Sequence, residues 1–385
     1  MKNPDYQVCR GLDPTIIIKA SVPGIPRLRR GYFTSLLLLA IGCAGLTSPL
    51  RGQFVYVTND GDNTVGVYSI SSNGALTAVS GSPFAAGISP GAVTVIPTER
   101  FTFVANESAN TVSAYSIGPN GALTPVPGSP FATGNQPSSL AVNGQFAYVT
   151  NDLDNTISGY SIGFNGALTP ISGAPVATGS GPISVAVDPT GKFAYVSNHN
   201  DNTVSGYSIG CDGVLTQVPG SPFPGGSEPH TIAIEPTGQF VYVANEVGAL
   251  GVGTVSAYAI GSDGALTSVP GSPFSSGTTP YSVAVDPTGK FAYVTDHSDD
   301  RVWAYSIGVN GALKPVKGSP FPTGGRPYWV AVDPSAGFVY VANQTDNTVS
   351  AYKMSSKGGL TPVPGSPFAT GNTPTGVTVS SKTRP

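Results

Sequence analysis

The sequence repeats one short motif seven times, with the form Phe-x-(Tyr/Phe)-Val-x-(Asn/Asp). Successive copies are separated by 47, 45, 47, 47, 51 and 47 residues and begin at Phe54, Phe101, Phe146, Phe193, Phe240, Phe291 and Phe338. A four-stranded blade of a β-propeller occupies about 40 to 50 residues. The repeat therefore predicts an all-β fold, a β-propeller of seven antiparallel blades.

One repeat shows how each blade is built. Residues 182–188 and 193–198 are short runs rich in β-branched and aromatic residues, which is typical of buried strands. Residues 204–209 and 214–218 predict the third and fourth strands, with Asp212-Gly213 as the tight hairpin turn between them. No segment of the repeats has a helical period. Each repeat is thus expected to form four antiparallel strands.

The two ends of the repeat region are expected to share a blade. The chain enters at a second strand, Phe54 to Thr58, and ends on an unpaired first strand, Pro374 to Ser380. Pairing these two would close the ring and satisfy both free edges. Between repeats, six motifs of the type Gly128-Ser129-Pro130-Phe131 and one variant, Gly173-Ala174-Pro175-Val176, predict a turn and an aromatic plug linking one blade to the next.

The N-terminal region differs from the repeats. Arginines at 27, 29 and 30 precede the apolar run 36–41 and a few small residues, which is typical of a signal peptide. We expect residues 1–52 to be an export or lipoprotein signal region and residues 53–385 to be the propeller. A lipid attached at Cys43 and a twin-arginine signal at Arg29-Arg30 are alternatives to a plain cleaved signal. The protein is expected to be periplasmic, secreted or lipid-anchored at the cell surface.

The composition of the chain limits the kinds of molecule that it is expected to bind. Only 10% of the 385 residues are charged and the net charge is -3. Without a basic stripe to neutralise phosphates, nucleic acid is not an expected partner. The three cysteines, two of them in the signal region, form no disulfide framework, and Cys211 is expected to be an isolated thiol. We expect a monomer whose partner is a small lactone, sugar or acid, or a surface protein.

Two sets of positions should face one mouth of the central channel, and here the repeats differ most. The first set follows the proline of each inner strand and comprises Gly91, Ser138, Ile183, His230, Tyr281, Tyr328 and Thr375. The second set lies in the loops between second and third strands and comprises Asp60, Glu107, Asp152, His199, Glu246, His297 and Gln344. All three histidines of the chain occur in these sets, in consecutive blades, so this sector is the predicted site.

Each residue of this sector has a functional and a structural interpretation. His230 should point into the channel mouth as a binding or catalytic group, whereas His199 and His297 are either ligand-binding or solvated turn residues. Glu246 either orients a base or stabilises the neighbouring insertion, the extra residues of this repeat around Gly248 to Gly251. Arg301, Arg326, Tyr281 and the pair Tyr328-Trp329 either bind a carboxylate or sugar ligand or cap the channel.

No metal or cofactor is predicted. A zinc or iron site made of His199, His230 and His297 would need three blades to converge. Aspartate-rich turns such as residues 59–63 lack the bidentate glutamate of a calcium loop, so their side chains are expected to form Asx turns.

Two repeat motifs resemble those of YVTN propellers and of the seven-bladed lactonase family. They are Phe54-Val55-Tyr56-Val57-Thr58-Asn59 and residues 280–289 (PYSVAVDPTG). That family includes bacterial 6-phosphogluconolactonases and a muconate-lactonising enzyme. The resemblance extends from about Gln53 to the C-terminus and implies the propeller fold. The resemblance is less specific for activity, because these motifs form the blades of both catalytic and non-catalytic members of the family.

The resemblance also implies catalytic roles, with departures. The muconate-lactonising relative implies a histidine after an inner strand's opening residue, which His230 matches. It implies an arginine beside the inner-strand proline of a following blade and a loop glutamate in that blade. Arg326 precedes Pro327 rather than following it, Gln344 occupies the loop position, and Glu246 lies in the histidine's own blade. The segment from Asp296 to Tyr305 resembles one that normally accompanies the histidine, but lies one blade later.

Two functions follow. The favoured prediction is an exported propeller that binds a ligand or a surface partner at its mouth. The alternative is a 6-phosphogluconolactonase-like lactonase, in which His230 is the general base, Arg326 polarises the carbonyl and Glu246 orients the imidazole.

Overall fold

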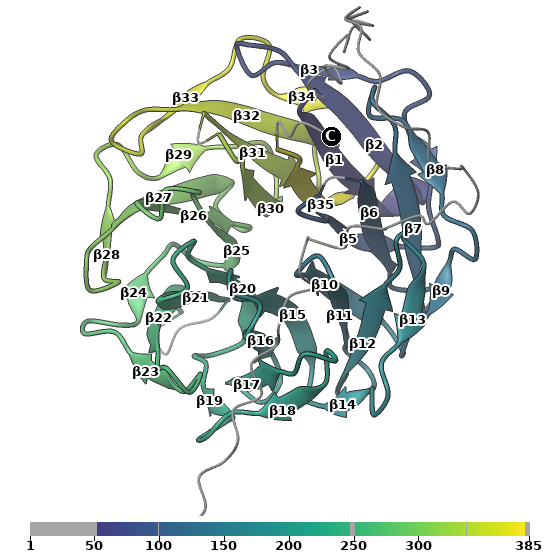
Figure 1. Ribbon diagram of the computed structural model, residues 1–385. Helices are drawn as coiled ribbons and strands as arrows, with labels where there is room; N and C mark the ends of the chain where they lie inside the picture. Colours follow the sequence, from purple (N-terminus) through teal and green to yellow (C-terminus); the bar gives the residue numbers. More distant parts are fainter. Residues whose placement is uncertain (1–51, 99, 247–250, 336, 382–385) are drawn as a thin grey trace, which may run out of the picture. The chain divides into compact units, whose positions relative to one another are not determined.

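The computed structural model describes residues 52–98, 100–246, 251–335 and 337–381, which form a ring of β-sheets (Figure 1). These residues contain one short 3₁₀ helix, η1 (Asp60–Asp62), and no helix that is long and apolar enough to cross a membrane. The expected signal region, through residue 51, lies outside the described residues, as do residues 247–250 of the insertion in the fifth repeat. The boundary at residue 53 therefore stays a prediction.

Seven antiparallel blades confirm the predicted fold, and each begins with an inner strand beside the channel (Figure 1). The inner strands are β35 (Pro374–Val379), β5 (Pro90–Val95), β10 (Pro137–Val142), β15 (Pro182–Val187), β20 (Pro229–Ile234), β25 (Pro280–Val285) and β30 (Pro327–Val332). The second strands are β1 (Phe54–Asn59), β6 (Phe101–Asn106), β11 (Phe146–Asn151), β16 (Phe193–Asn198), β21 (Phe240–Asn245), β26 (Phe291–Asp296) and β31 (Phe338–Asn343).

The outer half of each blade contains a long third strand and a divided edge. The third strands are β2 (Thr64–Ile70), β7 (Thr111–Ile117), β12 (Thr156–Ile162), β17 (Thr203–Ile209), β22 (Thr254–Ile260), β27 (Arg301–Ile307) and β32 (Thr348–Met354). The fourth strands are β3 (Leu76–Ala78), β8 (Leu123–Pro125), β13 (Leu168–Pro170), β18 (Leu215–Gln217), β23 (Leu266–Ser268), β28 (Leu313–Pro315) and β33 (Leu360–Pro362). Two-residue strands complete the edges: β4 (Phe84–Ala85), β9 (Phe131–Ala132), β14 (Val176–Ala177), β19 (Phe223–Pro224), β24 (Phe274–Ser275), β29 (Phe321–Pro322) and β34 (Phe368–Ala369).

These two-residue strands differ from the prediction for the Gly-Ser-Pro-Phe motifs. The motif was expected to be a link between blades, but its phenylalanine starts a strand that pairs with the third strand of its own blade, as Phe131 pairs with Val112. The turn before it contains a cis proline, Pro130, and interrupts the outer edge. The fourth strand and the two-residue strand therefore act as one divided outer strand.

The last strand of the propeller closes the ring as predicted. Strand β35 pairs antiparallel with β1, with Val379 opposite Val55 and Pro374 opposite Asn59. The Phe54 amide also donates to Ser380 Oγ at 2.9 Å. The first blade is thus built from both ends of the repeat region.

The core lies between neighbouring blades, where buried tyrosines join one sheet to the next. Tyr195, in the second strand of its blade, is fully buried and donates from its hydroxyl to the carbonyl of Gly264, in the outer hairpin of the next blade, at 2.8 Å. Phe193 packs against the same hairpin glycine. Equivalent tyrosine bonds at four other interfaces fix the blades in place, from Tyr148, Tyr242, Tyr293 and Tyr340.

Candidate functional site

One backbone pattern shapes the whole channel mouth. In every blade, the loop residue after the second strand donates its amide hydrogen to the carbonyl of the residue that precedes the inner-strand proline. The donor and acceptor pairs are Asp60 and Thr373, Glu107 and Ser89, Asp152 and Gln136, His199 and Gly181, Glu246 and Glu228, His297 and Thr279, and Gln344 and Arg326. The mouth thus presents varied side chains on a repeated backbone.

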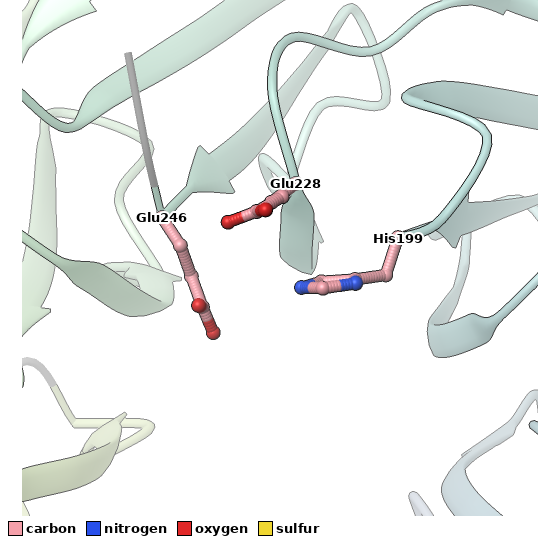
Figure 2. Close-up of side chains that lie close together, drawn as sticks. All are labelled: His199, Glu228 and Glu246. Atoms are coloured by element: carbon pink, nitrogen blue, oxygen red, sulfur yellow. The ribbon is translucent and has the colours of Figure 1, made fainter. Parts of the chain in front are cut away.

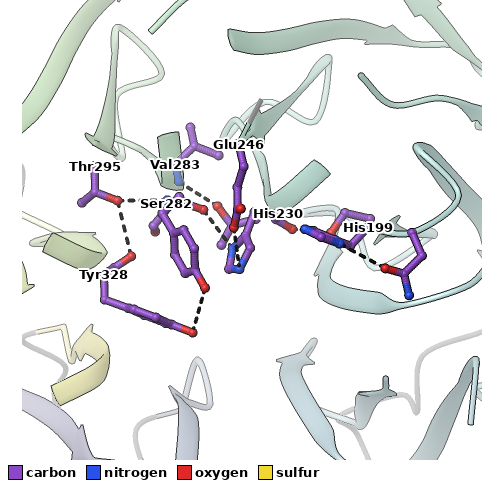
Figure 3. Close-up of polar contacts among 11 residues, drawn as sticks. His199, His230, Glu246, Ser282, Val283, Thr295 and Tyr328 are labelled. Carbon is purple, nitrogen blue, oxygen red and sulfur yellow. Dashed lines mark hydrogen bonds and ion pairs between the residues drawn. The ribbon is translucent and has the colours of Figure 1, made fainter. Parts of the chain in front are cut away.

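A shift in strand pairing accompanies this pattern. In each blade, the register between the inner and second strands shifts at the residue after the proline. Such β-bulges re-aim a side chain that regular alternation would place elsewhere. In the sector predicted from the sequence, the re-aimed side chains are His230, Tyr281 and Tyr328, and their rings contact one another across three blades (Figure 3).

His230, on β20, is buried, with 6% of its surface exposed. Its Nδ1 lies 3.1 Å from the carbonyl oxygen of Tyr281, and its ring packs on the Tyr281 ring with the centroids 3.6 Å apart. A carbonyl only accepts hydrogen bonds, so Nδ1 carries the proton and Nε2 has a free lone pair. Burial, with the nearby charge of His199, lowers the pKa of His230 to about 3 and keeps the imidazole neutral.

Glu246, immediately after β21, lies beside this lone pair. Its Oε1 is 3.7 Å from Nε2 of His230, so the structure brings together the predicted base and the predicted orienting acid (Figure 3). Burial raises the pKa of Glu246, and the neighbouring Glu228 raises it further. The contact is longer than a hydrogen bond, so the two side chains are neighbours without a direct hydrogen bond.

His199 and Glu228 complete the cluster around Glu246 (Figure 2). One donor atom from each of His199, Glu228 and Glu246 lies within 4.8 Å of the other two. His199 was among the residues predicted from the sequence, whereas Glu228 was missed. Its signal was its place before the inner-strand proline, the position that Arg326 occupies two blades later.

Tyr281, Tyr328 and His297 form the other half of the site. The Tyr281 hydroxyl donates to the Tyr328 hydroxyl at 3.2 Å, and the His297 ring stacks on Tyr281 with the centroids 5.0 Å apart. Burial raises the pKa of Tyr281 to about 12 and holds that of Tyr328 well above its ordinary value, so both hydroxyls keep their protons. Burial also lowers the pKa of His297. The Tyr328 hydroxyl can therefore donate a hydrogen bond to a ligand at neutral pH, whereas the Tyr281 proton is already donated to Tyr328.

Three predicted site residues lie apart from this cluster. Trp329 is partly buried and packs against the core cluster between the seventh and first blades, so its predicted role in ligand binding stays a prediction. The bulge turns Tyr328 to the mouth, and the next residue then faces the neighbouring blade. Arg301 is exposed at the start of β27, and Arg326 is exposed at the rim, where its charge affects His297. No contact joins either arginine to His230 within the described residues.

An acidic group faces the site from the opposite side of the mouth. Burial and the charges of Asp60 and Asp152 raise the pKa of Glu107 to about 7. The charge of Glu107 in turn raises the pKa of both Tyr281 and Tyr328. Glu107 occupies a predicted mouth position but was not chosen as a site residue. The mouth is therefore acidic on both sides of the tyrosines.

Comparison with known proteins identifies similar sequences and folds. The family described as "Lactonase, 7-bladed beta-propeller" matches residues 40–135, 120–269 and 217–319. A candidate 6-phosphogluconolactonase from Bacteroides uniformis is 18% identical, with a TM-score of 0.74 over 86% of this chain and 99% of that one. The periplasmic gluconolactonase of Pseudomonas aeruginosa is also 18% identical, with a TM-score of 0.69 over 86% and 100%. No curated protein matches the sequence.

Proposed function

Because the chain belongs to the lactonase family of seven-bladed β-propellers, we propose that it hydrolyses a sugar-type lactone at the channel mouth. The family match favours this alternative over the ligand-binding or surface-interaction function that we preferred from the sequence. The observation that carries the proposal is the pairing of a neutral, buried His230 with Glu246 beside two tyrosine hydroxyls.

In the proposed mechanism, His230 activates water. Its Nε2 accepts a proton as the water oxygen attacks the acyl carbon, and the carboxylate of Glu246 stabilises the imidazolium that forms. The negative charge that develops on the carbonyl oxygen accepts a hydrogen bond from Tyr328, whose proton is not committed to another described residue. The bond from the acyl carbon to the ring oxygen then breaks, and His230 returns the proton to that oxygen. The product is a hydroxy acid.

Charge at the mouth favours an uncharged substrate. Five carboxyl groups gather there, from Asp60, Glu107, Asp152, Glu228 and Glu246, and Arg326 is the nearby cationic side chain at the described rim. A phosphate would be repelled by this acidic mouth, whereas sugar hydroxyls can donate to carboxylates and the C–H face of a sugar can pack on tyrosine rings. We therefore propose an unphosphorylated aldonolactone as substrate, with Arg326 as a rim contact instead of the predicted carbonyl-polarising group.

Acid release from glucono-1,5-lactone, followed by pH-stat, tests the proposal. The His230→Asn variant keeps a donor for the Tyr281 carbonyl and removes the Nε2 base, so we expect kcat/KM to fall by about 10²–10⁴-fold. The control is Tyr258→Phe in the same blade, which removes a hydroxyl bonded to the Pro224 carbonyl away from the mouth and should leave kcat/KM unchanged. Equal background rates for wild type and both variants would reject the lactonase and leave a ligand-binding propeller. Faster turnover of 6-phosphogluconolactone would reject the preference for an uncharged substrate.

Export remains a separate proposal, based on the charged and apolar pattern before residue 42. N-terminal sequencing of the native protein, with mass spectrometry for a lipid on Cys43, tests it. A mature start between residues 42 and 53 is expected. A native protein that retains residues 27–41 would contradict cleavage.

A further inference from the structure

The cluster of His199, Glu228 and Glu246 has the composition of a metal site. The three side chains come from two adjacent blades: His199 follows β16, Glu228 precedes β20 and Glu246 follows β21. One donor atom of each lies within 4.8 Å of the other two, and the three side chains converge on one small space (Figure 2). We propose that this cluster binds one divalent transition-metal ion, zinc, at the channel mouth.

The buried His230 supports this proposal independently. The proton of His230 is on Nδ1, which donates to the Tyr281 carbonyl, so Nε2 has a lone pair. That lone pair faces Oε1 of Glu246 at 3.7 Å, and Nε2 makes no hydrogen bond within the described residues. Two electron-rich atoms at this distance repel unless a proton, a water or a cation lies between them.

Unbalanced negative charge is a further reason to expect a cation. Within the part of the chain that the structure describes, neither Glu228 nor Glu246 pairs with a lysine or an arginine. Both side chains are half-buried, so their mutual repulsion is only partly screened by solvent. A divalent ion between them would neutralise both charges.

The backbone holds these ligands in place before any ion binds. The Glu246 amide donates to the Glu228 carbonyl at 3.1 Å, and the His199 amide donates to the Gly181 carbonyl at 2.8 Å. The Glu228 amide donates to Oδ1 of Asn202 at 2.7 Å, which fixes its left-handed backbone, φ 49°. Preorganised ligands lose little conformational entropy on binding.

The donor set selects the class of metal. Imidazole nitrogen with carboxylate oxygens suits Zn²⁺, whereas Ca²⁺ and Mg²⁺ prefer oxygen ligands alone. The set differs from the three histidines considered from the sequence. His297 lies on the far side of Tyr281, against which it stacks, and is not part of the cluster.

Zinc binding to the purified protein tests the site without any activity assay. After treatment with chelator and dialysis, titration calorimetry with ZnCl₂ should give one site per chain. Glu228→Gln and His199→Asn should each weaken binding at least about 10-fold, because each removes a ligand. His297→Asn, a matched change at the equivalent loop position, should bind zinc like wild type. Melting temperatures of the metal-free variants check that each is folded.

Absence of zinc binding by folded wild-type protein would overturn the proposal. Unchanged binding in both Glu228→Gln and His199→Asn, or an equal loss in His297→Asn, would do so too, because the ion would then lie elsewhere. The test is separable from the lactonase proposal. Lactone turnover by protein that binds no zinc would remove the metal site and leave the activity, and zinc binding without turnover would do the reverse.

Discussion

At the scale of single residues, two chemical contributions to the proposed lactonase can be separated. His230 supplies the base, and Tyr328 supplies a hydrogen bond to the developing oxyanion. Tyr328→Phe removes that bond, and we expect kcat to fall about 100-fold with a small change in KM. The control is Tyr352→Phe, in the same blade as Tyr328, which removes a hydroxyl bonded to the Pro322 carbonyl of the preceding blade. Steady-state kinetics on glucono-1,5-lactone check both, and an equal effect of the two changes would argue against a role for Tyr328 in the reaction.

Glu107 gives a prediction for stability against pH. Its pKa is about 7 in the folded protein and near 4.5 otherwise, so the folded state binds more protons between these values. Stability is therefore lost as the pH rises through that window. Glu107→Gln removes the charge, and the variant should melt a few degrees above wild type at pH 8 but not at pH 4. Calorimetric melting at several pH values checks this, and a difference independent of pH would contradict it.

A site residue could be predicted from the sequence where the repeat pattern alone fixes its position, and not where strand pairing or a bulge decides it. His230 and Glu246 were predicted because each occupies a repeat position known to face the mouth. The packing of Trp329 against the neighbouring blade could not be predicted, because the bulge after Pro327 breaks simple alternation and no residue type signals that shift. Glu228 was missed because the backbone bond that brings it beside Glu246 appears only when the strands are paired.

At the scale of elements, glycines in the turns of the outer strands allow a left-handed backbone, and some of them also leave room for a side chain of the neighbouring blade. Gly264 has a φ of 84°, and a Cβ there would lie 2.6 Å from the ring of Phe193 in the preceding blade. Gly173, in the turn between β13 and β14, has the same φ but no atom within 4 Å of such a Cβ. The pair therefore separates backbone strain from steric conflict between blades.

Alanine substitution at both glycines tests this separation. Gly173→Ala should lower the free energy of unfolding by about 1–2 kcal/mol through backbone strain alone. Gly264→Ala should add a packing cost of about 1–3 kcal/mol, because Phe193 must shift. Chemical denaturation measures both. Equal losses of unfolding free energy in the two variants would mean that Phe193 moves aside without a packing penalty.

The sequence predicted these hairpins and most strands well, because Asn-Gly and Asp-Gly turns and alternating apolar residues are local signals. It did not predict the division of the outer strand. The two-residue strands are too short to show a period, and their pairing with the third strand joins residues about 20 positions apart in the sequence, as Phe131 and Val112 are.

At the scale of the whole molecule, the shared first blade should control cooperativity. Deleting residues 374–385 removes β35, exposes the edge of β1 and opens the ring. We expect the truncated protein to aggregate or to unfold in more than one step. Deleting only residues 382–385 is the control and should leave a single transition. Size-exclusion chromatography and thermal melting distinguish the two, and a monomeric, cooperative truncation would show that closure is dispensable.

Ring closure also delays the pairing of the first strand while the chain is being synthesised. Phe54 pairs with Ser380, a residue made 326 positions later. At a synthesis rate of about 5–20 residues per second, β1 waits for tens of seconds before its partner emerges. During that interval a buried, apolar strand, Phe-Val-Tyr-Val-Thr-Asn, has one unpaired edge. The nascent protein is therefore most prone to pairing with other chains at the first strand it makes.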